Sequence, residues 1–245
     1  MRASAASLRF PLPEGAALAR NFPKRSRDRD AMNVLLQYLP QFESGMLTTI
    51  ALTLLGFVGA LTAGILVAIL RVSPVPILRG VGTVYVETLQ NIPLLALLVI
   101  SIFALPEVGL QADLFTTAAL TIAVYEAAFI AEAIRAGINT VALGQSEAAR
   151  ALGLTFGQSL RFVIMPQALR AVIQPIGTLF IALTMNTALA AGVGIVELTA
   201  AANQVDLVEA QPIPIYVGAA LGYMAIAAVG AFVTGTLERR MAIVR

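Results

Sequence analysis

Residues 147–166 read EAARALGLTFGQSLRFVIMP, and this polar, basic stretch lies between long apolar segments. Glu147, Arg150 and Arg161 give the stretch its charge, while Gly153 and Pro166 disfavour one continuous helix through it. The flanking segments are long enough to cross a bilayer. The arrangement therefore predicts an integral membrane protein that exposes this loop at one membrane surface.

The composition points to lipid as the solvent of this chain. Its 245 residues are 58% hydrophobic and 12% charged, with a mean hydropathy of +0.85, whereas soluble domains are about 25% charged. The absence of Cys and His excludes disulfides, thiol nucleophiles, the usual zinc sites and histidine acid–base chemistry. The net charge is only +2 and the basic residues lie in short loops, which argues against nucleic-acid binding despite a pI near 9.3.

Five apolar segments are long enough to span a membrane as helices, which takes about 20 residues. Two of them carry carboxylates, Glu87 in the second segment and Glu126 and Glu132 in the third. We therefore predict an all-α fold with five transmembrane helices, at residues 46–70, 83–105, 114–134, 171–196 and 213–237.

The placement of Lys and Arg orients these spans, because cytoplasmic loops are enriched in both residues. Basic residues occupy the loops after the first and third spans and the C-terminus, whereas the loops at 106–113 and 197–211 carry only acidic charges. This pattern predicts that the C-terminus and the long basic loop are cytoplasmic and that the N-terminus lies outside. The basic residues concerned are Arg71, Arg79, Arg135, Arg150, Arg161, Arg170, Arg239, Arg240 and Arg245.

Residues 1–31 depart from this rule, because they hold the only Lys and six further basic residues among the sixteen of the chain. They contain no apolar stretch long enough for a signal peptide. Two interpretations stay open: a flexible or amphipathic extension, or a mis-set start with Met32 as the true first residue. We divide the chain into an N-terminal extension and leading segment at 1–43, a transmembrane domain at 44–240 and a cytoplasmic tail at 241–245.

Residues 146–160 of the basic loop have the pattern of an amphipathic helix. Gly153 and Gly157 are expected to divide it into short helices, with a tight turn at Gly153, and Pro166 is expected to precede the next span. A short helix below the membrane fits a groove on another protein, or alternatively rests on the lipid interface. The apolar residues that would contact a partner are Ala148, Ala151, Leu152 and Leu160.

The sequence Glu147-Ala148-Ala149, followed by Gly153 and then by Val163-x-Met165-Pro166, resembles the EAA loop of bacterial ABC importer permeases. That family pattern reads Glu-Ala-Ala, three residues, Gly, nine residues, Ile, one residue, Leu-Pro. Further stretches make the chain after Met32 similar to the permease subunits of polar amino-acid ABC importers. They are LTTIALTLL at 47–55, YVETLQNIPLL at 85–95, AEAIRAGI at 131–138 and IALTMNTALAAGVGI at 181–195, while RVSPVPILR at 71–79 and INTVALGQSEAARALGL at 138–154 look closest to glutamate permeases of actinobacteria.

This resemblance implies an assembly in the bacterial inner membrane. Two permease chains, identical or related, would sit above two copies of an ABC ATPase, and an extracytoplasmic solute-binding protein would deliver an amino acid. ATP and Mg²⁺ would bind the partner ATPase, and the EAA loop would transmit its closure to the spans. The loop residues that the resemblance assigns to this docking are Glu147, Ala148, Ala149, Arg150, Gly153 and Pro166.

The sequence agrees with this division of labour. It contains no GxxxxGK[ST] phosphate-binding loop, and no Lys follows Lys24. We therefore expect a transport subunit that binds no cofactor of its own and is not an enzyme.

Polar residues inside the spans are the candidates for a substrate path, because ionisable groups are costly in a bilayer. Glu126 would suit the ammonium of an amino acid or a cationic side chain, and it suits a glutamate side chain poorly. For Glu87 and Glu132 a structural role competes, including an ion pair between Glu132 and Arg135, and Asn186 could simply bond across helices. Pro93 would free a backbone carbonyl. The path candidates are Glu87, Asn91, Glu126, Asn186 and Thr187.

Two positions depart from the family pattern. Relatives often carry Lys-Asp/Asn-Thr where this chain has Met185-Asn186-Thr187, and often a small or hydroxyl residue where it has Glu126.

Glutamate or another polar amino acid is the expected substrate, with a cationic amino acid as the alternative. A self-sufficient secondary transporter or channel is a competing hypothesis, and it would tolerate damage to Glu147 or Gly153. An intramembrane enzyme is the third, and the lack of His, Cys and paired metal-binding carboxylates disfavours it.

Small residues four apart, Ala60 with Gly64 and Gly218 with Gly222, lie on one face of their helices. They would allow close helix approach, or they reflect the high frequency of such residues in membrane helices.

Overall fold

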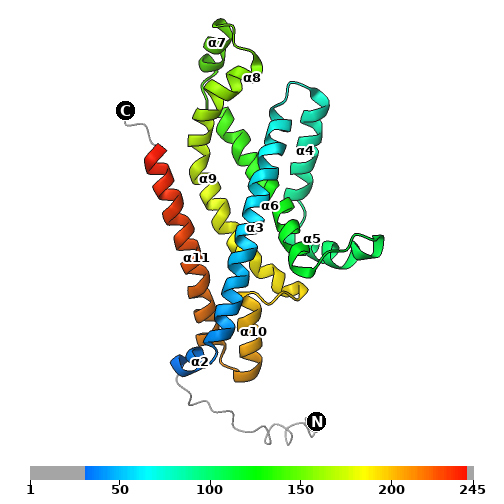
Figure 1. Cartoon of the computed structure of the whole chain (residues 1–245), viewed down its shortest axis with the longest axis vertical. Coiled ribbons are helices and arrows are strands. Elements are labelled where there is room, and N and C mark those ends of the chain that lie inside the picture. The colour runs from blue at the N-terminus through cyan, green and yellow to red at the C-terminus, as the bar shows by residue number, and fades with distance from the viewer. Residues whose placement is uncertain (1–30, 242–245) are drawn as a thin grey trace, which may run out of the picture.

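The structure is a computed structural model that describes residues 31–241, and within that range the chain forms helices and no β-strand (Figure 1). Four helical segments are long and apolar enough to cross a membrane. They are α3 (Leu39–Val72), α6 (Leu114–Asn139), the segment Phe156–Val193 that contains α9 (Met165–Asn186), and α11 (Pro212–Met241). The shorter helices are α2 (Ala31–Gln37) and α10 (Leu198–Glu209) at one end, and α7 (Leu143–Ala151) and α8 (Phe156–Ser159) at the other.

The predicted span at 83–105 is present as a broken helix. It consists of α4 (Pro76–Gln90) and a second helical run that starts with α5 (Leu94–Val99) and continues to Val108, bent by 101° from α4. Pro93 causes the break, since it has no N–H to donate and disfavours the helical conformation of Ile92. The count of five spans holds when this bent pair is taken as one of them.

The other predicted spans lie within longer helices, with one adjustment. The helix that was expected at 171–196 already begins at Met165, with Pro166 in its first turn, and after Asn186 it tightens into the 3-10 helix Thr187–Val193. It ends at Gly194, whose φ of 96° is the left-handed conformation that favours glycine.

The packing core lies between α3 and α6, and small residues allow these helices to approach closely. A Cβ on Gly64 would lie 2.7 Å from Ile130 Cγ2 and 3.0 Å from Ala127 O, and Ala60 is fully buried in the same row. Gly218 and Gly222 of α11 contact Leu35 and Leu198. The expected close approach of helix backbones is therefore present at Gly64, whereas the neighbours of Gly218 and Gly222 are the side-chain ends of Leu35 and Leu198.

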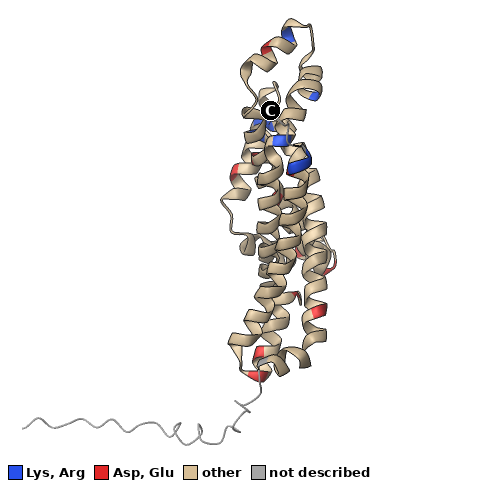
Figure 2. Ribbon diagram, turned by 90° about the vertical axis from the view of Figure 1, so that its left-hand side faces the viewer, with Lys and Arg blue, Asp and Glu red and all other residues tan. Residues whose placement is uncertain are grey.

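Charge separates the two ends of the molecule. Figure 2 shows Lys and Arg gathered at the end that carries α7 and α8, whereas the end that carries α2 and α10 shows only Asp and Glu among the described residues, although Glu132, Glu147 and Glu238 lie near the Lys and Arg end. We call these the basic end and the acidic end. The chain enters the described bundle at the acidic end and leaves it at the basic end, as an odd number of spans requires (Figure 1). This distribution is the one that the positive-inside rule expects with the basic end in the cytoplasm.

The predictions about residues 1–30 and the tail lie outside the described residues. The domain boundary at residue 44 stays a prediction, and α3 runs across it.

Candidate functional site

The loop at residues 143–164 projects beyond the spans at the basic end (Figure 1). Glu147, Ala148 and Arg150 of α7 are exposed, whereas Ala149 is only 2% exposed because it faces the rest of the loop. Of the apolar residues that were predicted to contact a partner, Ala148, Ala151 and Leu152 are exposed and Leu160 is half-buried, so the contact with a partner stays a prediction. Ala149 faces inward instead.

A turn at Gly153 ends α7, as the sequence predicted. Gly153 has a φ of 79°, and its N–H donates to Arg150 O at 2.9 Å while Leu154 N–H donates to Ala149 O at 3.1 Å. These bonds satisfy carbonyls that the helix end leaves unpaired. No other atom lies within 4 Å of a Cβ built on Gly153, so the position requires glycine for its backbone conformation and not for space.

The helix that follows the turn is fixed by a capping box. Thr155 Oγ1 accepts from Gln158 N–H at 3.3 Å, and Thr155 N–H donates to Gln158 Oε1 at 2.9 Å. Gly157 lies inside α8, so the predicted break at Gly157 is wrong, because the capping box stabilises the turn of helix that contains it. Pro166 is exposed in the first turn of α9, where a missing N–H costs no hydrogen bond.

The loop presents large apolar side chains at its surface. Leu143 is 80% exposed and Leu152 is 81% exposed, and Phe156 and Phe162 are also exposed. Exposed large apolar side chains on a loop that projects from the spans are typical of an interaction surface. Glu147 and Arg150 lie between Leu143 and Leu152 in the sequence. The loop can therefore offer a partner protein both apolar contacts and charged side chains.

Two of the predicted path residues meet in the middle of the bundle. Asn186 Nδ2 of α9 donates to Glu126 Oε1 of α6 at 2.7 Å, and Glu126 is only 2% exposed. Thr187 is fully buried, but its hydroxyl donates to Thr184 O at 2.7 Å and so is occupied by its own helix. The pair of Glu126 and Asn186 therefore offers a carboxylate and an amide from two helices at one place.

Glu87 and Asn91 form a separate group at the end of α4. Both are exposed, and Asn91 Nδ2 donates to the backbone oxygen of Glu87 at 2.6 Å, which stabilises the last turn before the break at Pro93. Within residues 31–241 we find no hydrogen bond between this group and Glu126 or Asn186. The structure thus brings together two of the predicted path residues and leaves Glu87 and Asn91 apart from them.

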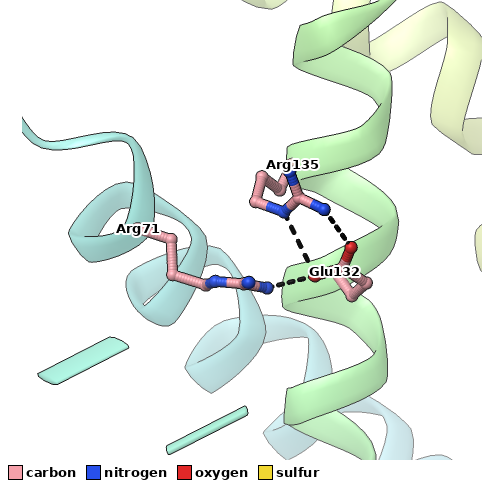
Figure 3. A network of polar contacts seen from close by, with 3 residues as sticks. All are labelled: Arg71, Glu132 and Arg135. Carbon is pink, nitrogen blue, oxygen red and sulfur yellow. Dashed lines mark hydrogen bonds and ion pairs between the residues drawn. The ribbon is translucent and has the colours of Figure 1, made fainter. Parts of the chain in front are cut away.

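Two carboxylate clusters were only partly foreseen. Glu132 pairs with Arg135 as expected, and it also binds Arg71 of α3 (Figure 3). Glu197 is fully buried at the acidic end, where its carboxylate accepts from Ala200 N–H at 2.8 Å, from Thr49 at 3.4 Å and from Tyr223. The sequence predicted an acidic loop at 197–211, but the structure forms α10 over most of it, with Glu197 as the N-cap. Nothing local to Glu197 indicates its partners on α3 and α11.

Comparison with known proteins agrees with this architecture. Residues 60–243 match the family described as the binding-protein-dependent transport system inner membrane component. The chain is 34% identical over 213 residues to the probable glutamine ABC transporter permease protein GlnM of Bacillus subtilis (strain 168), covering 86% of this chain and 97% of that protein. It is 42% identical over 161 residues to the glutamate transport system permease protein GluC of Corynebacterium glutamicum, covering 61% of this chain and 71% of GluC. A chain in the crystal structure of an amino acid ABC transporter with histidines has a TM-score of 0.79 at 30% identity, covering 86% of this chain and 99% of that chain.

The chain therefore belongs to the family of inner-membrane components of binding-protein-dependent transport systems, and it is a multi-pass inner-membrane protein. Within that family it groups with the amino-acid ABC transporter permeases, the membrane-spanning subunits of such importers. The resemblance, the fold class and the membrane location predicted from the sequence are confirmed. Permeases of this kind are transport components, and nothing in the comparisons points to an enzyme.

Proposed function

We propose that the chain is the permease subunit of an ATP-driven importer for glutamate or another polar amino acid, and that the loop at residues 143–164 docks its ATPase. The observation that carries the docking proposal is the projecting tip at the basic end, with Leu143 and Leu152 about four-fifths exposed on either side of Glu147. A short exposed helix with apolar side chains is suited to a groove on another protein. A connector lying on lipid would bury these side chains in the interface and would require no fixed turn at Gly153.

The partners follow from the same proposal. Two ATPase copies bind ATP and Mg²⁺, a second permease chain completes the pathway, and an extracytoplasmic binding protein supplies the substrate. The relatives named for glutamine and glutamate support a polar amino acid as cargo.

The docking test compares two substitutions at glycines of the same kind. Gly153→Asp and Gly109→Asp both place an aspartate where φ is positive, 79° and 85°, and where no neighbour lies within 4 Å. Only Gly153 lies in the loop at the basic end. Each tagged variant is purified in mild detergent from native membranes, and the co-purified proteins are identified by mass spectrometry.

We expect Gly109→Asp to retain an ABC ATPase at the wild-type amount and Gly153→Asp to lose it or to lose uptake that depends on ATP. Normal ATPase recovery and normal uptake in Gly153→Asp would refute docking through this loop. A wild-type chain that is recovered alone in several detergents, and that transports without ATP, would instead support a self-sufficient transporter.

For the substrate, the pair of Glu126 and Asn186 supports recognition of the α-ammonium and α-carboxylate groups that all amino acids share. The carboxylate accepts from an ammonium, and the Asn186 amide can donate to a carboxylate once a substrate displaces it from Glu126. A buried polar pair of this kind within spans is a functional candidate because it is expensive to maintain in a membrane.

The substrate test is an uptake profile of Glu126→Gln in vesicles with acidic, neutral polar and cationic amino acids, with the exposed Glu43→Gln as the control. We expect Glu126→Gln to change affinity or preference and Glu43→Gln to change neither. A loss confined to cationic substrates would support the alternative cargo, and an unchanged profile would remove Glu126 from the path.

A further inference from the structure

Glu132 joins two helices at the basic end (Figure 3). Its carboxylate accepts from Arg135 Nε at 3.1 Å and from Arg135 Nη2, one turn away in α6, and it also accepts from Arg71 Nη1 in the last turn of α3. Arg71 and Glu132 are 61 residues apart in the sequence. The bond to Arg71 therefore links two helices, whereas the bonds to Arg135 stay within one.

Arg71 is also held from the side of α4. A Cβ on Gly82 would lie 2.8 Å from Arg71 Cγ and 3.2 Å from Leu70 Cβ, so α4 runs directly against the stem of Arg71. The Arg71 side chain is only 11% exposed. Because a guanidinium with so little exposure needs a counter-charge, Glu132 adds a charged contact between the α3–α4 hairpin and α6 to the apolar packing of α3 on α6.

The same turns of α6 lead directly to the loop. Thr140 caps α6 by donating its N–H and its hydroxyl to Gly137 O, at 3.1 and 2.6 Å, and α7 begins at Leu143. The end of α6 that carries Glu132 is therefore the part of the spans that precedes α7 in the chain, while α8 and residues 160–164 contact α7 from the other side of the loop. Without the link to Arg71, α3 and α4 have no charged contact with that end among the described residues.

We propose that the pair of Arg71 and Glu132 is a strut that makes the basic ends of α3, α4 and α6 move as one body with α7. This inference rests on the proposed docking of an ATPase on α7. Both residues are positioning residues, since they act through the helices they join and not through contact with substrate. Coupling between distant sites can be carried by hydrogen-bond networks and rigid helices, and the charge-assisted hydrogen bond between α3 and α6 is such a contact.

The test compares Arg71→Gln with Arg135→Gln in proteoliposomes that contain the permease, its ATPase and the binding protein. Arg71→Gln removes the bond between helices, and Arg135→Gln removes only the bonds within α6. We expect Arg71→Gln to keep the bound ATPase and its hydrolysis while uptake per ATP falls about fivefold or more. Arg135→Gln should stay near the wild-type ratio, and Arg71→Lys should restore part of it.

Uptake per ATP at the wild-type value in Arg71→Gln, with the ATPase bound, would overturn the strut and leave the docking intact. Absence of the ATPase from the wild-type complex would instead refute the proposed function itself. The two failures are thus told apart by the wild-type sample.

A second measurement needs no change at Arg71, in case its variants fold poorly. The chain has no Cys, so pairs of spin labels can be introduced at exposed positions without removing native thiols. We expect the distance from Ile77 on α4 to Asn139 on α6 to stay the same when ATP binds, while the distance from Asn139 to Glu238 on α11 changes. A change between Ile77 and Asn139 as large as that between Asn139 and Glu238 would overturn the proposal.

Discussion

Gly137→Ala is expected to force α6 and α9 apart where these helices adjoin the loop at the basic end. A Cβ at Gly137 would lie 2.2 Å from Val172 Cγ1 and 3.2 Å from Ala168 O. Carbon atoms pack best at about 3.5–4.0 Å, so this methyl needs a separation that is larger by roughly 1.3–1.8 Å. Val172 is 2% exposed and β-branched, so its side chain has little freedom to turn away.

The cost of this overpacking should be about 1–3 kcal/mol in the free energy of unfolding. Alanine also favours a helix over glycine by about 0.8–1.0 kcal/mol, which partly hides the steric cost. Gly80→Ala in α4 is the matched control, because the same methyl there meets no atom within 4 Å. The difference between the two variants therefore isolates the steric cost.

The assay is reversible unfolding in mixed detergent micelles, with helix content as the signal. A double variant, Gly137→Ala with Val172→Ala, removes the Cγ1 atom that clashes, so its destabilisation should be smaller than the sum of the two single changes, by about 0.5–3 kcal/mol. Equal stability of Gly137→Ala and Gly80→Ala, or strict additivity in the double variant, would refute the close contact between α6 and α9.

Three further changes test other contacts of the bundle. Tyr223→Phe removes the hydroxyl that binds the buried Glu197 carboxylate and should cost about 1.5–3 kcal/mol, as hydrogen bonds to charged groups do, in the same unfolding assay. Tyr85→Phe removes a single neutral bond, of 2.6 Å to Val124 O, and should cost only about 0.5–1.5 kcal/mol. A larger loss in Tyr85→Phe than in Tyr223→Phe would contradict the hydrogen bond between Tyr223 and the Glu197 carboxylate. Pro93→Ala supplies an N–H and lifts the steric block at the bend, so hydrogen exchange at the break after α4 should slow, and unchanged exchange would show that tertiary packing alone holds the bend.

The loop at the basic end was predictable in much of its detail because its determinants are local. The turn at Gly153 depends on the backbone freedom of one residue, and the start of α9 at Met165 depends on the proline that follows it, Pro166. The inner face of the loop was not predictable. Whether Ala148 or Ala149 points inward depends on how α7 lies against α8 and the start of α9, and the apolar pattern of the sequence fits both arrangements.

The break after Asn91 shows the same limit. Pro93 marks the position from the sequence, but a proline within a membrane helix is compatible with a slight kink as well as with the observed 101° bend. The large bend was decided by where Leu94 and Leu98 of α5 are buried, against the core that α3 and α6 form.

The sequence by itself determined the membrane-spanning class, the orientation of the charges and the exposed loop, because hydropathy and charge are properties of single segments and lipid acts on each segment separately. Only the tertiary structure decided which polar groups meet. Asn186 reaches Glu126 from 60 residues away, Arg71 reaches Glu132 from 61, and Thr49 reaches Glu197 from 148. Such pairs depend on how the helices cross and on their register, and both are set by glycine contacts such as those of Gly64 and Gly137. These glycine contacts produce no periodic pattern in the sequence around the polar residues.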